Sequence, residues 1–497
     1  MDCMVPATSS MSNLPLETLL AILNMLDAKS MLRCCAVCRL WQETVKSSTE
    51  LQYTIELWAD GMIPGPYTLL TAVQKMARLK EWRDSWASLD WKSRTVFPIM
   101  EHPRAYELVA GVFAQQNTWP QSDFSSIRLP SSEMEAQFYS NQNIGLESLD
   151  FAMDPTQDFV VFLHKQTDED IGNFECRSLS NLGPHPRAFS PRQSFGLKDD
   201  NFRRIFMQVA DDVIGLLFRT TGDLGAPSLR LILYNWREGF PLADLTQFPG
   251  SVCDFALISP RAYILACVSH HEYHLGGLGQ IHIYTFQDTP DPPRLVATLR
   301  LPLLHHSRSL DRIVAHSGPY CANPVSGALF SKSNEQRICV ISLAYDRAEF
   351  YTVYVHHRCF EKYLKNDGPA PEVVLWDNWG PRNTRLLPGR HLFWLRYVHG
   401  ERVVCPIDPD HPDRVEILDF GIIPTRPGFD KSTVVRPTTI VSPVDRPLFM
   451  NSVTTSLPFR RISRELPGDD PHVLFLLDQD RLIGVNEDVN QLTVYAV

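Results

Sequence analysis

The chain has 497 residues, of which 44% are hydrophobic and 21% charged, shares that are ordinary for a soluble globular protein. Its formal net charge of −10 argues against a broad nucleic-acid surface, which normally carries an excess of basic residues. The N-terminus does not read as a signal peptide, and the apolar runs are far shorter than the ~20 residues of a membrane helix. Eleven cysteines without framework spacing, and no N-glycosylation sequon, favour reduced thiols in the cytoplasm or nucleus.

The N-terminal part is expected to begin with a disordered tail over residues 1–11 and to continue as a helix. Asn13 is a candidate N-cap, and Pro15 stands in the first turn, where its missing N–H costs nothing. One apolar stripe follows at i, i+3, i+4 and i+7, formed by Leu16, Leu19, Leu20 and Leu23. Asp27 and Ser30 offer a stop and a new cap.

A second helix is predicted from about Met31 to Val45. One of its stripes contains Cys34, Cys38, Trp41 and Val45, and a second apolar side contains Leu32, Cys35, Ala36 and Leu40. A helix that is apolar on more than one side must be covered by more than its own hairpin. Two helices of this size are also too few for a stable core. The pattern therefore indicates a partner.

A third helix is predicted over about residues 69–89, after the break at Pro64-Gly65-Pro66. Large apolar residues recur along it between charged ones, namely Leu79, Trp82, Trp86 and Leu89. We interpret it as a helical linker between the N-terminal part and the body of the protein.

From about residue 104 the hydrophobic period changes to two, and no helix is expected to interrupt the strands. Candidate strands are Tyr106–Ala114, Phe159–His164, Ile205–Phe218, Leu229–Trp236, Phe255–Val268, Gln280–Phe286, Arg337–Leu343, Phe350–Val355, His391–Val398, Arg402–Pro406, Val415–Phe420, Val473–Leu477 and Leu492–Val497. A loose module recurs roughly every fifty residues, close to the length of a propeller blade. The final strand, 491–497, favours a closed ring, because terminal strands of a propeller usually complete one shared blade.

The opening helices carry a known pattern: a Leu-Pro start, spaced leucines, a Leu-Asp between helices and a Val-Cys-x-x-Trp close. Its residues are Leu14, Pro15, Glu17, Leu20, Leu23, Leu26, Asp27, Leu32, Val37, Cys38 and Trp41. This segment of about forty residues resembles the F-box motif. The resemblance implies docking to a Skp-type adaptor and, through it, to a cullin-based ubiquitin ligase.

The resemblance also implies which residues would bind the adaptor or fill the core beneath the interface, a division that the sequence leaves open. They are Leu14, Pro15, Leu19, Leu20, Leu23, Leu26, Val37, Cys38 and Trp41. The remainder of the chain is similar to a group of fungal, basidiomycete-like F-box proteins with a propeller-like C-terminal half. Segments 51–62, 78–86, 150–158 and 376–385 carry this second resemblance.

The expected fold is therefore α+β and multidomain: a small all-α hairpin and helical linker, then an all-β propeller of six to eight blades, with seven favoured. The expected boundaries are a tail at 1–11, an F-box domain at 12–56, a linker at 57–96 and a propeller at 97–497. Recognition of a protein substrate is expected on the propeller, whose loops stand on a rigid scaffold.

Metal and cofactor chemistry is not expected. Cys34-Cys35-x-x-Cys38 lacks the further ligands of a zinc site, so these thiols are expected to pack as buried side chains. The cluster of His270, His271 and His274 lacks the helix of an HExxH site and reads as part of a flexible loop. The glycines at 276–279 precede a strand, whereas a phosphate-binding loop precedes a helix.

Catalytic residues are not expected either. The acid pairs Asp211-Asp212 and Asp469-Asp470 stand in turns or polar loops, where they are more often turn formers than catalytic dyads. The segment around Trp376 and Trp379, with Arg382 and Arg385, is typical both of an interaction hot spot and of blade packing. We favour packing and keep these four residues as candidates for partner binding.

The sequence thus predicts a non-catalytic substrate receptor that binds an adaptor through its helices and a protein substrate through its propeller. Two alternatives stay open. One is a propeller hydrolase or lyase, which convergent His, Asp and Arg around a deep central pocket would support. The other is a scaffold that binds the adaptor without directing ubiquitination.

Overall fold

The structure is a computed structural model that describes residues 14–66, 69–100, 103–117, 122–131, 134–166, 171–197, 204–221, 227–269, 278–289, 291–365, 368, 370–389, 395–422, 436–441, 443, 445–466 and 471–497. The chain divides into two compact units. The smaller contains residues 1–86 and 324–332, and the larger contains residues 87–323 and 333–497. The expected tail at 1–11 lies outside the described residues, as do His270, His271, His274 and the acid pair at 469–470.

The smaller unit is mainly helical. Its helices are α1 (Leu16–Asn24), α2 (Ala28–Cys34), α3 (Arg39–Ser47), α4 (Thr49–Ala59) and α5 (Ala72–Ser88). The Asp27 side chain caps α2, because its Oδ1 accepts a hydrogen bond from the Ser30 N–H at 2.9 Å. Of the helices in the described residues, none is long and apolar enough to cross a bilayer.

The prediction of one helix from Met31 to Val45 is wrong. A turn follows α2, and Cys38 takes extended backbone with φ −157° and ψ 165° before α3 begins. This break lets Trp41 and Val45 join the core that α1 begins, which a straight helix would prevent. Helix α4 was not predicted, although Ser48 precedes it as an N-cap whose side chain accepts from the Leu51 N–H.

A two-stranded sheet completes the smaller unit. Strand β1 (Met62–Pro64) pairs antiparallel with β20 (Phe330–Lys332). In the sequence, β20 lies between β19 and β21, two strands of the larger unit. The Phe330 ring packs edge-on against Trp82 at 5.8 Å between ring centroids. A Cβ on Gly65 would lie 1.9 Å from the Ala328 carbonyl oxygen, so this close approach requires glycine.

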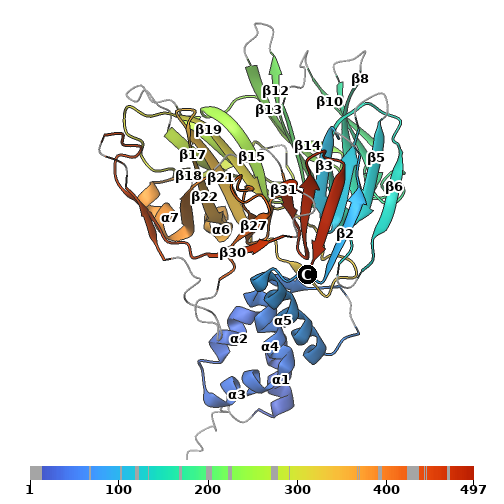
Figure 1. Ribbon diagram of the computed structural model, residues 1–497, viewed down its shortest axis with the longest axis vertical. Coiled ribbons are helices and arrows are strands. Elements are labelled where there is room, and N and C mark those ends of the chain that lie inside the picture. The colour runs from blue at the N-terminus through green and yellow to red at the C-terminus, as the bar shows by residue number, and fades with distance from the viewer. Residues whose placement is uncertain are drawn as a thin grey trace, which may run out of the picture. The chain divides into compact units, whose positions relative to one another are not determined.

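Within the described residues, the larger unit contains seven blade sheets that follow one another along the chain (Figure 1). Six of these sheets have four antiparallel strands, and the blade 4 sheet gains a fifth strand. Blade 1 consists of β3 (Ala105–Val109), β4 (Val112–Gln116), β5 (Asp123–Arg128) and β6 (Gln137–Asn143), and blade 2 of β7 (Ser148–Asp154), β8 (Phe159–Gln166), β9 (Ile171–Ser178) and β10 (Arg192–Gly196). Blade 3 consists of β11 (Arg204–Ala210), β12 (Val213–Thr221), β13 (Pro227–Asn235) and β14 (Phe240–Leu245). Blade 4 begins with β15 (Ser251–Ser259), β16 (Ala262–Ser269), β17 (Leu278–Thr285) and β18 (Arg294–Arg300).

Blade 5 consists of β19 (Leu310–Ser317), β21 (Ile338–Tyr345), β22 (Glu349–His356) and β24 (Thr384–Pro388). Blade 6 consists of β25 (Val398–His399), β26 (Arg402–Val404), β27 (Arg414–Asp419) and β30 (Arg460–Glu465). Blade 7 consists of β31 (His472–Leu477), β32 (Arg481–Asn486), β33 (Gln491–Ala496) and β2 (Ser93–Pro98). The fold is a seven-bladed β-propeller, as predicted.

The ring closes as the sequence predicts. β33 from the C-terminal end pairs with β2, which precedes blade 1, so the blue β2 lies beside the red terminal strands in Figure 1. This pairing removes two open sheet edges. The first strand of the propeller, β2, begins at Ser93.

Several predicted long strands are hairpins. The candidate Tyr106–Ala114 turns at Ala110 and Gly111, whose φ values of 50° and 77° are typical of a type I′ turn. The candidates Ile205–Phe218 and Phe255–Val268 likewise cover β11–β12 and β15–β16. Inner strands such as β16 are buried almost throughout because blades pack face to face.

The expectation that no helix interrupts the strands is also wrong. α6 (Arg358–Leu364), β23 (Glu372–Val374) and α7 (Trp376–Asn383) lie between two strands of blade 5. β23 adds a parallel fifth strand to β18 of blade 4, and this pairing joins the two blades at their outer edges. A further hairpin, β28 (Thr438–Ile440) and β29 (Val453–Thr455), contacts α7 and β24.

Candidate functional site

The helical unit has a small core of its own. Its buried residues are Leu19, Leu23, Met31, Val45 and Leu51, against which Leu20, Leu26, Cys34, Cys35, Trp41 and Ile55 pack partly buried. Leu19 and Leu23 come from the predicted stripe of α1, and Val45 and Leu51 come from α3 and α4. This core is shared among four helices, so α4 supplies part of the cover that the two predicted helices lack.

The same helices also expose apolar side chains. The exposed fraction is 86% for Met25 and 67% for Val37. The full set, which we call the apolar helix surface, is Leu16, Ile22, Met25, Leu32, Val37 and Leu40. Scattered apolar residues are common on any protein, but six within 25 residues of a small helical unit are typical of an interaction site.

The structure divides the predicted adaptor-binding residues into three classes of burial. Leu19 and Leu23 are buried in the core; Leu14, Leu20, Leu26 and Trp41 are partly buried; and Pro15, Val37 and Cys38 are exposed. The sequence reasoning missed Leu16, Ile22, Met25, Leu32 and Leu40 as surface candidates. The signal for Leu32 and Leu40 was the second apolar side noted for this segment.

The three neighbouring cysteines are not all buried as expected. Cys34 and Cys35 are partly buried, and Cys38 is exposed because it lies in the break between α2 and α3. Burial raises the pKa of the Cys35 thiol above its ordinary value. Within the described residues, no three His, Cys, Asp or Glu side chains are grouped so as to hold a metal ion.

The tryptophan segment of the propeller has a structural role. Trp376 and Trp379 are buried in α7, and the Trp379 Nε1–H donates to the Arg300 carbonyl of blade 4 at 2.8 Å. Arg385 is fully buried and donates to the carbonyls of Leu457 and Arg436 at 2.8 and 2.9 Å.

Desolvation of this buried guanidinium lowers the pKa of Arg385 to about 10. The burial of Trp376, Trp379 and Arg385 agrees with the packing role that the sequence favours, and it leaves these side chains almost no surface for a partner. Arg382 alone of the four candidates is exposed.

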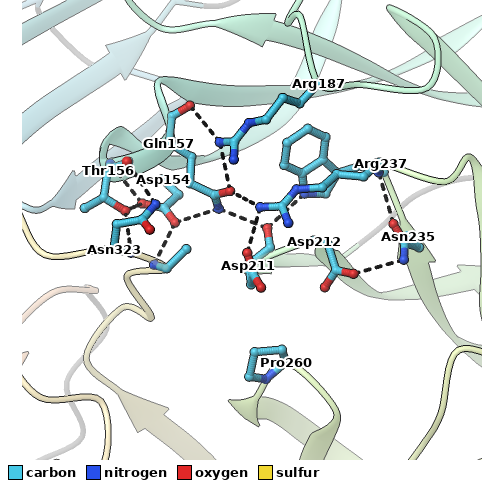
Figure 2. Close-up of polar contacts among 12 residues, drawn as sticks. Asp154, Thr156, Gln157, Arg187, Asp211, Asp212, Asn235, Arg237, Pro260 and Asn323 are labelled. Atoms are coloured by element: carbon cyan, nitrogen blue, oxygen red, sulfur yellow. Dashed lines mark hydrogen bonds and ion pairs between the residues drawn. The ribbon is translucent and has the colours of Figure 1, made fainter.

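A polar network joins turns of blades 2, 3 and 5 (Figure 2), and Arg261 extends it to blade 4. Gln157, in the turn after β7, donates from Nε2 to Asp154 Oδ2 at 2.9 Å and to the Asp211 carbonyl at 3.0 Å. Its Oε1 accepts from both Arg187 and Arg237, and Arg237 also pairs with the Asp211 carboxylate at 2.7 Å. Asp154 accepts in addition from the Ala322 N–H at 3.0 Å, which brings in blade 5.

The predicted turn pair Asp211-Asp212 belongs to this network. Both Asp212 oxygens accept from the Arg261 guanidinium of blade 4 at 2.7 Å, and the Asn235 amide donates to Asp212 at 3.0 Å. Burial acts to raise the pKa of Asp212, but the hydrogen bonds and charge of Arg261 lower it overall. Asp211 and Asp212 are therefore not simple solvated turn formers, because each pairs with an arginine, Arg237 and Arg261 respectively.

The central channel holds two acids with perturbed pKa values. Burial raises the pKa of Asp150 and of Asp254 to about 7 each. Glu107 and Arg396 lie in the same cavity as an ion pair, with 2.7 Å between Glu107 Oε1 and Arg396 Nε. Acids with perturbed pKa values beside an arginine in a central cavity are what the hydrolase or lyase alternative requires.

Size and hydrogen bonding count against a catalytic channel. The cavity has a volume of 110 Å³, well below the ~300–1,000 Å³ of ordinary small-molecule sites. Both oxygens of Asp254 accept backbone N–H groups, from Phe255 and Ala315, which joins blade 4 to blade 5. A larger hollow of 520 Å³ at blade 4 contains Arg261 and Arg294, whose guanidinium groups bond to Asp212 and to the Gly368 carbonyl.

Comparison with known proteins supports the predicted resemblance of the N-terminal helices to the F-box motif. An F-box-like family model matches residues 11–55, so the chain carries an F-box-like domain there. A search of curated proteins found no match.

Three of the solved structures that resemble the chain are the following. The C-terminal WD40 domain of Sif2 is 10% identical with a TM-score of 0.37, covering 81% of this chain and 98% of that one. BamB from Moraxella catarrhalis is 9% identical with a TM-score of 0.33, covering 81% and 98%. The WD40 domain of SCAP from fission yeast is 10% identical with a TM-score of 0.33, covering 81% and 94%. Since these TM-scores are below 0.5, the propeller assignment rests on the seven sheets and their closure.

Proposed function

We propose that this protein is the substrate receptor of a Skp–cullin–F-box ubiquitin ligase in the cytoplasm or nucleus. The observation that carries the proposal is the apolar helix surface within the segment that matches the F-box-like family. Free thiols at all ten cysteines of the described residues agree with a reducing compartment. The propeller supplies a rigid body whose loops present a protein substrate.

In this proposal the helices act only by binding. The apolar helix surface, Pro15 and Cys38 contact the Skp-type adaptor directly, together with the exposed edges of Leu14, Leu20, Leu26 and Trp41. Leu19 and Leu23 support this surface from the core below. A cullin joins through the adaptor and brings a ubiquitin-loaded enzyme close to the substrate, so the gain is effective concentration.

The apolar area is of the right size for this role. Complete burial of a Val, Leu, Ile or Met side chain contributes roughly 1.5–3 kcal/mol, and the six residues are on average about half exposed. Covering them would contribute about 5–10 kcal/mol. Association costs are of the same order, so a stable complex also needs polar contacts and a preorganised surface.

The test is co-purification of the full chain with a Skp-type adaptor. We expect Met25→Asp/Val37→Asp to lose adaptor binding at least a hundredfold, because each charge would be buried at the interface. Leu14→Ala/Pro15→Ala is expected to weaken binding less. The matched control is Leu69→Asp/Val73→Asp, which changes two side chains of similar exposure outside the apolar helix surface: Leu69 precedes α5, and Val73 lies in its first turn.

Failure of the wild-type chain to retain the adaptor would refute the proposal, as would equal losses in the test and control variants. A scaffold without ligase activity is distinguished by reconstitution. If the adaptor and cullin bind but ubiquitin transfer to no bound protein is accelerated, the scaffold alternative replaces the receptor.

A further inference from the structure

The connection between β9 and β10 of blade 2, residues 179–191, is long and well fixed. The Ser180 N–H donates to Asp158 Oδ1 at 2.8 Å, and the Leu179 N–H donates to the Asp158 carbonyl at 2.9 Å. Further along, the His185 ring is buried and its Nε2 lies 3.1 Å from the Gln157 carbonyl oxygen. The loop is therefore a fixed surface feature rather than a loose tether.

Phe189 is the exposed aromatic residue of this loop. Its exposed fraction is 69%, yet its backbone N–H donates to the Trp236 carbonyl at 3.2 Å. The ring lies against Gly239, where a Cβ would come within 2.3 Å of it. One side of the ring is thus held by blade 3, and much of the remaining ring surface is open to a partner.

Arg187 lies two residues before Phe189 and is also exposed. Its Nη2 donates to Gln157 Oε1 at 3.1 Å and approaches the Gln157 carbonyl at 3.4 Å, as Figure 2 shows for the side chain. Within the part of the chain that the structure describes, no carboxylate pairs with it. The neighbouring Arg237 differs, since it pairs with Asp211 at 2.7 Å and stacks on Trp236 at 5.1 Å.

We propose that Arg187 and Phe189 form a docking site for a protein segment that carries an anionic side chain next to a large apolar one. This inference rests on the proposed function and names the chemistry of its substrate. A guanidinium held by neutral groups can give an anion charge-assisted hydrogen bonds, and an anchored aromatic ring offers apolar contact at little entropic cost. A nucleic acid fits less well, because the chain has a formal net charge of −10, which disfavours binding of a polyanion.

The experiment measures binding of the fluorescently labelled full chain to an array of twelve-residue peptides. Each peptide carries one Phe or Leu and, one to four residues away, a Glu, phosphoserine, Gln or Lys. We expect the wild-type chain to prefer the Glu or phosphoserine peptides over Gln and Lys, and the Glu and phosphoserine arms decide which anion is recognised.

Two substitutions locate the binding. Phe189→Ala should weaken binding at least tenfold, and Arg187→Glu should reverse the preference from anionic to Lys-bearing peptides. Phe138→Ala on β6, with a similarly exposed ring, and Arg382→Glu on α7 are the matched controls and should leave binding unchanged. All four positions are exposed, so thermal melting is expected to show intact folding.

The inference is overturned if no anionic–apolar peptide binds the wild-type chain, or if the control variants lose as much as the test variants. Unchanged preference in Arg187→Glu overturns it too. Adaptor capture is measured on the same preparations. If the adaptor is captured but no peptide preference is seen, only the Arg187–Phe189 site is rejected. If the peptides are discriminated but the adaptor is not captured, only the ligase proposal is rejected.

Discussion

Replacement of Asp254 by asparagine should change the pH dependence of stability. Asp254 is 2% exposed, and its two oxygens accept the N–H groups of Phe255 and Ala315 at 2.9 and 3.0 Å. Burial raises the pKa of its carboxyl from 3.8 to about 7, against the opposing effect of these hydrogen bonds and of the Arg312 charge. Between these two pKa values the folded state binds more protons than the unfolded state, so this group makes the protein less stable as pH rises from about 4 to about 7.

The magnitude follows from the two pKa values. One pKa unit corresponds to about 1.4 kcal/mol, so the ionised carboxylate costs about 4 kcal/mol above pH 7. From pH 5 to pH 8 the wild-type chain should lose about 3 kcal/mol through Asp254. Asparagine cannot ionise, but its NH2 group faces one of the two backbone donors, which adds a cost that does not depend on pH.

The assay is chemical denaturation of Asp254→Asn and the wild-type chain at pH 5, 6, 7 and 8. The difference between the two unfolding free energies should move in favour of the variant by about 3 kcal/mol over this range. Desolvation lowers the pKa values of buried histidines such as His185 and His357, so these groups make the protein more stable as pH rises. Their contribution is the same in the variant and the wild-type chain, and it cancels in the difference. The exposed Asp291→Asn controls for loss of a charge, and a pH-independent difference for Asp254→Asn would refute the reasoning.

Three further substitutions test the packing. Leu23→Ala should destabilise the helical unit by about 2–5 kcal/mol because Leu23 is fully buried in its core, and differential scanning calorimetry should show a change in the helical transition alone. Trp379→Phe removes the hydrogen bond to the Arg300 carbonyl and should cost about 1–3 kcal/mol in urea denaturation; no loss would contradict the proposed bridge from blade 5 to blade 4. Gly65→Ala should abolish the β1–β20 pairing, seen as faster hydrogen exchange over residues 62–64, and unchanged exchange would show that the backbone can shift.

Local sequence rules predicted the elements where local spacing decides the outcome. The leucine stripe of α1, the Asp27 cap and the period-two strands each depend on residues within a few positions of one another. The closing strand could also be predicted, because an unpaired terminal strand would leave an open sheet edge. The F-box-like segment was also recognisable, because its pattern depends on a short run of spaced residues.

Local rules failed where distant residues decide the conformation. The break at Cys38 lets Trp41 and Val45 reach a core that α4 helps to form, and nothing nearby in the sequence specifies that core. α7 forms although Pro381 lies inside it, since Trp376 and Trp379 are buried with side chains of blades 4 and 5.

The sequence by itself determined that the chain has an F-box-like helical segment followed by a closed ring of β-sheets. Only the tertiary structure decided which side chains a partner could reach. It buried Trp379 and Arg385, left Met25 and Phe189 exposed, and paired Asp211 with Arg237. The physical reason is that burial and electrostatic environment depend on neighbours brought together by folding, whereas motif and period depend on neighbours along the chain.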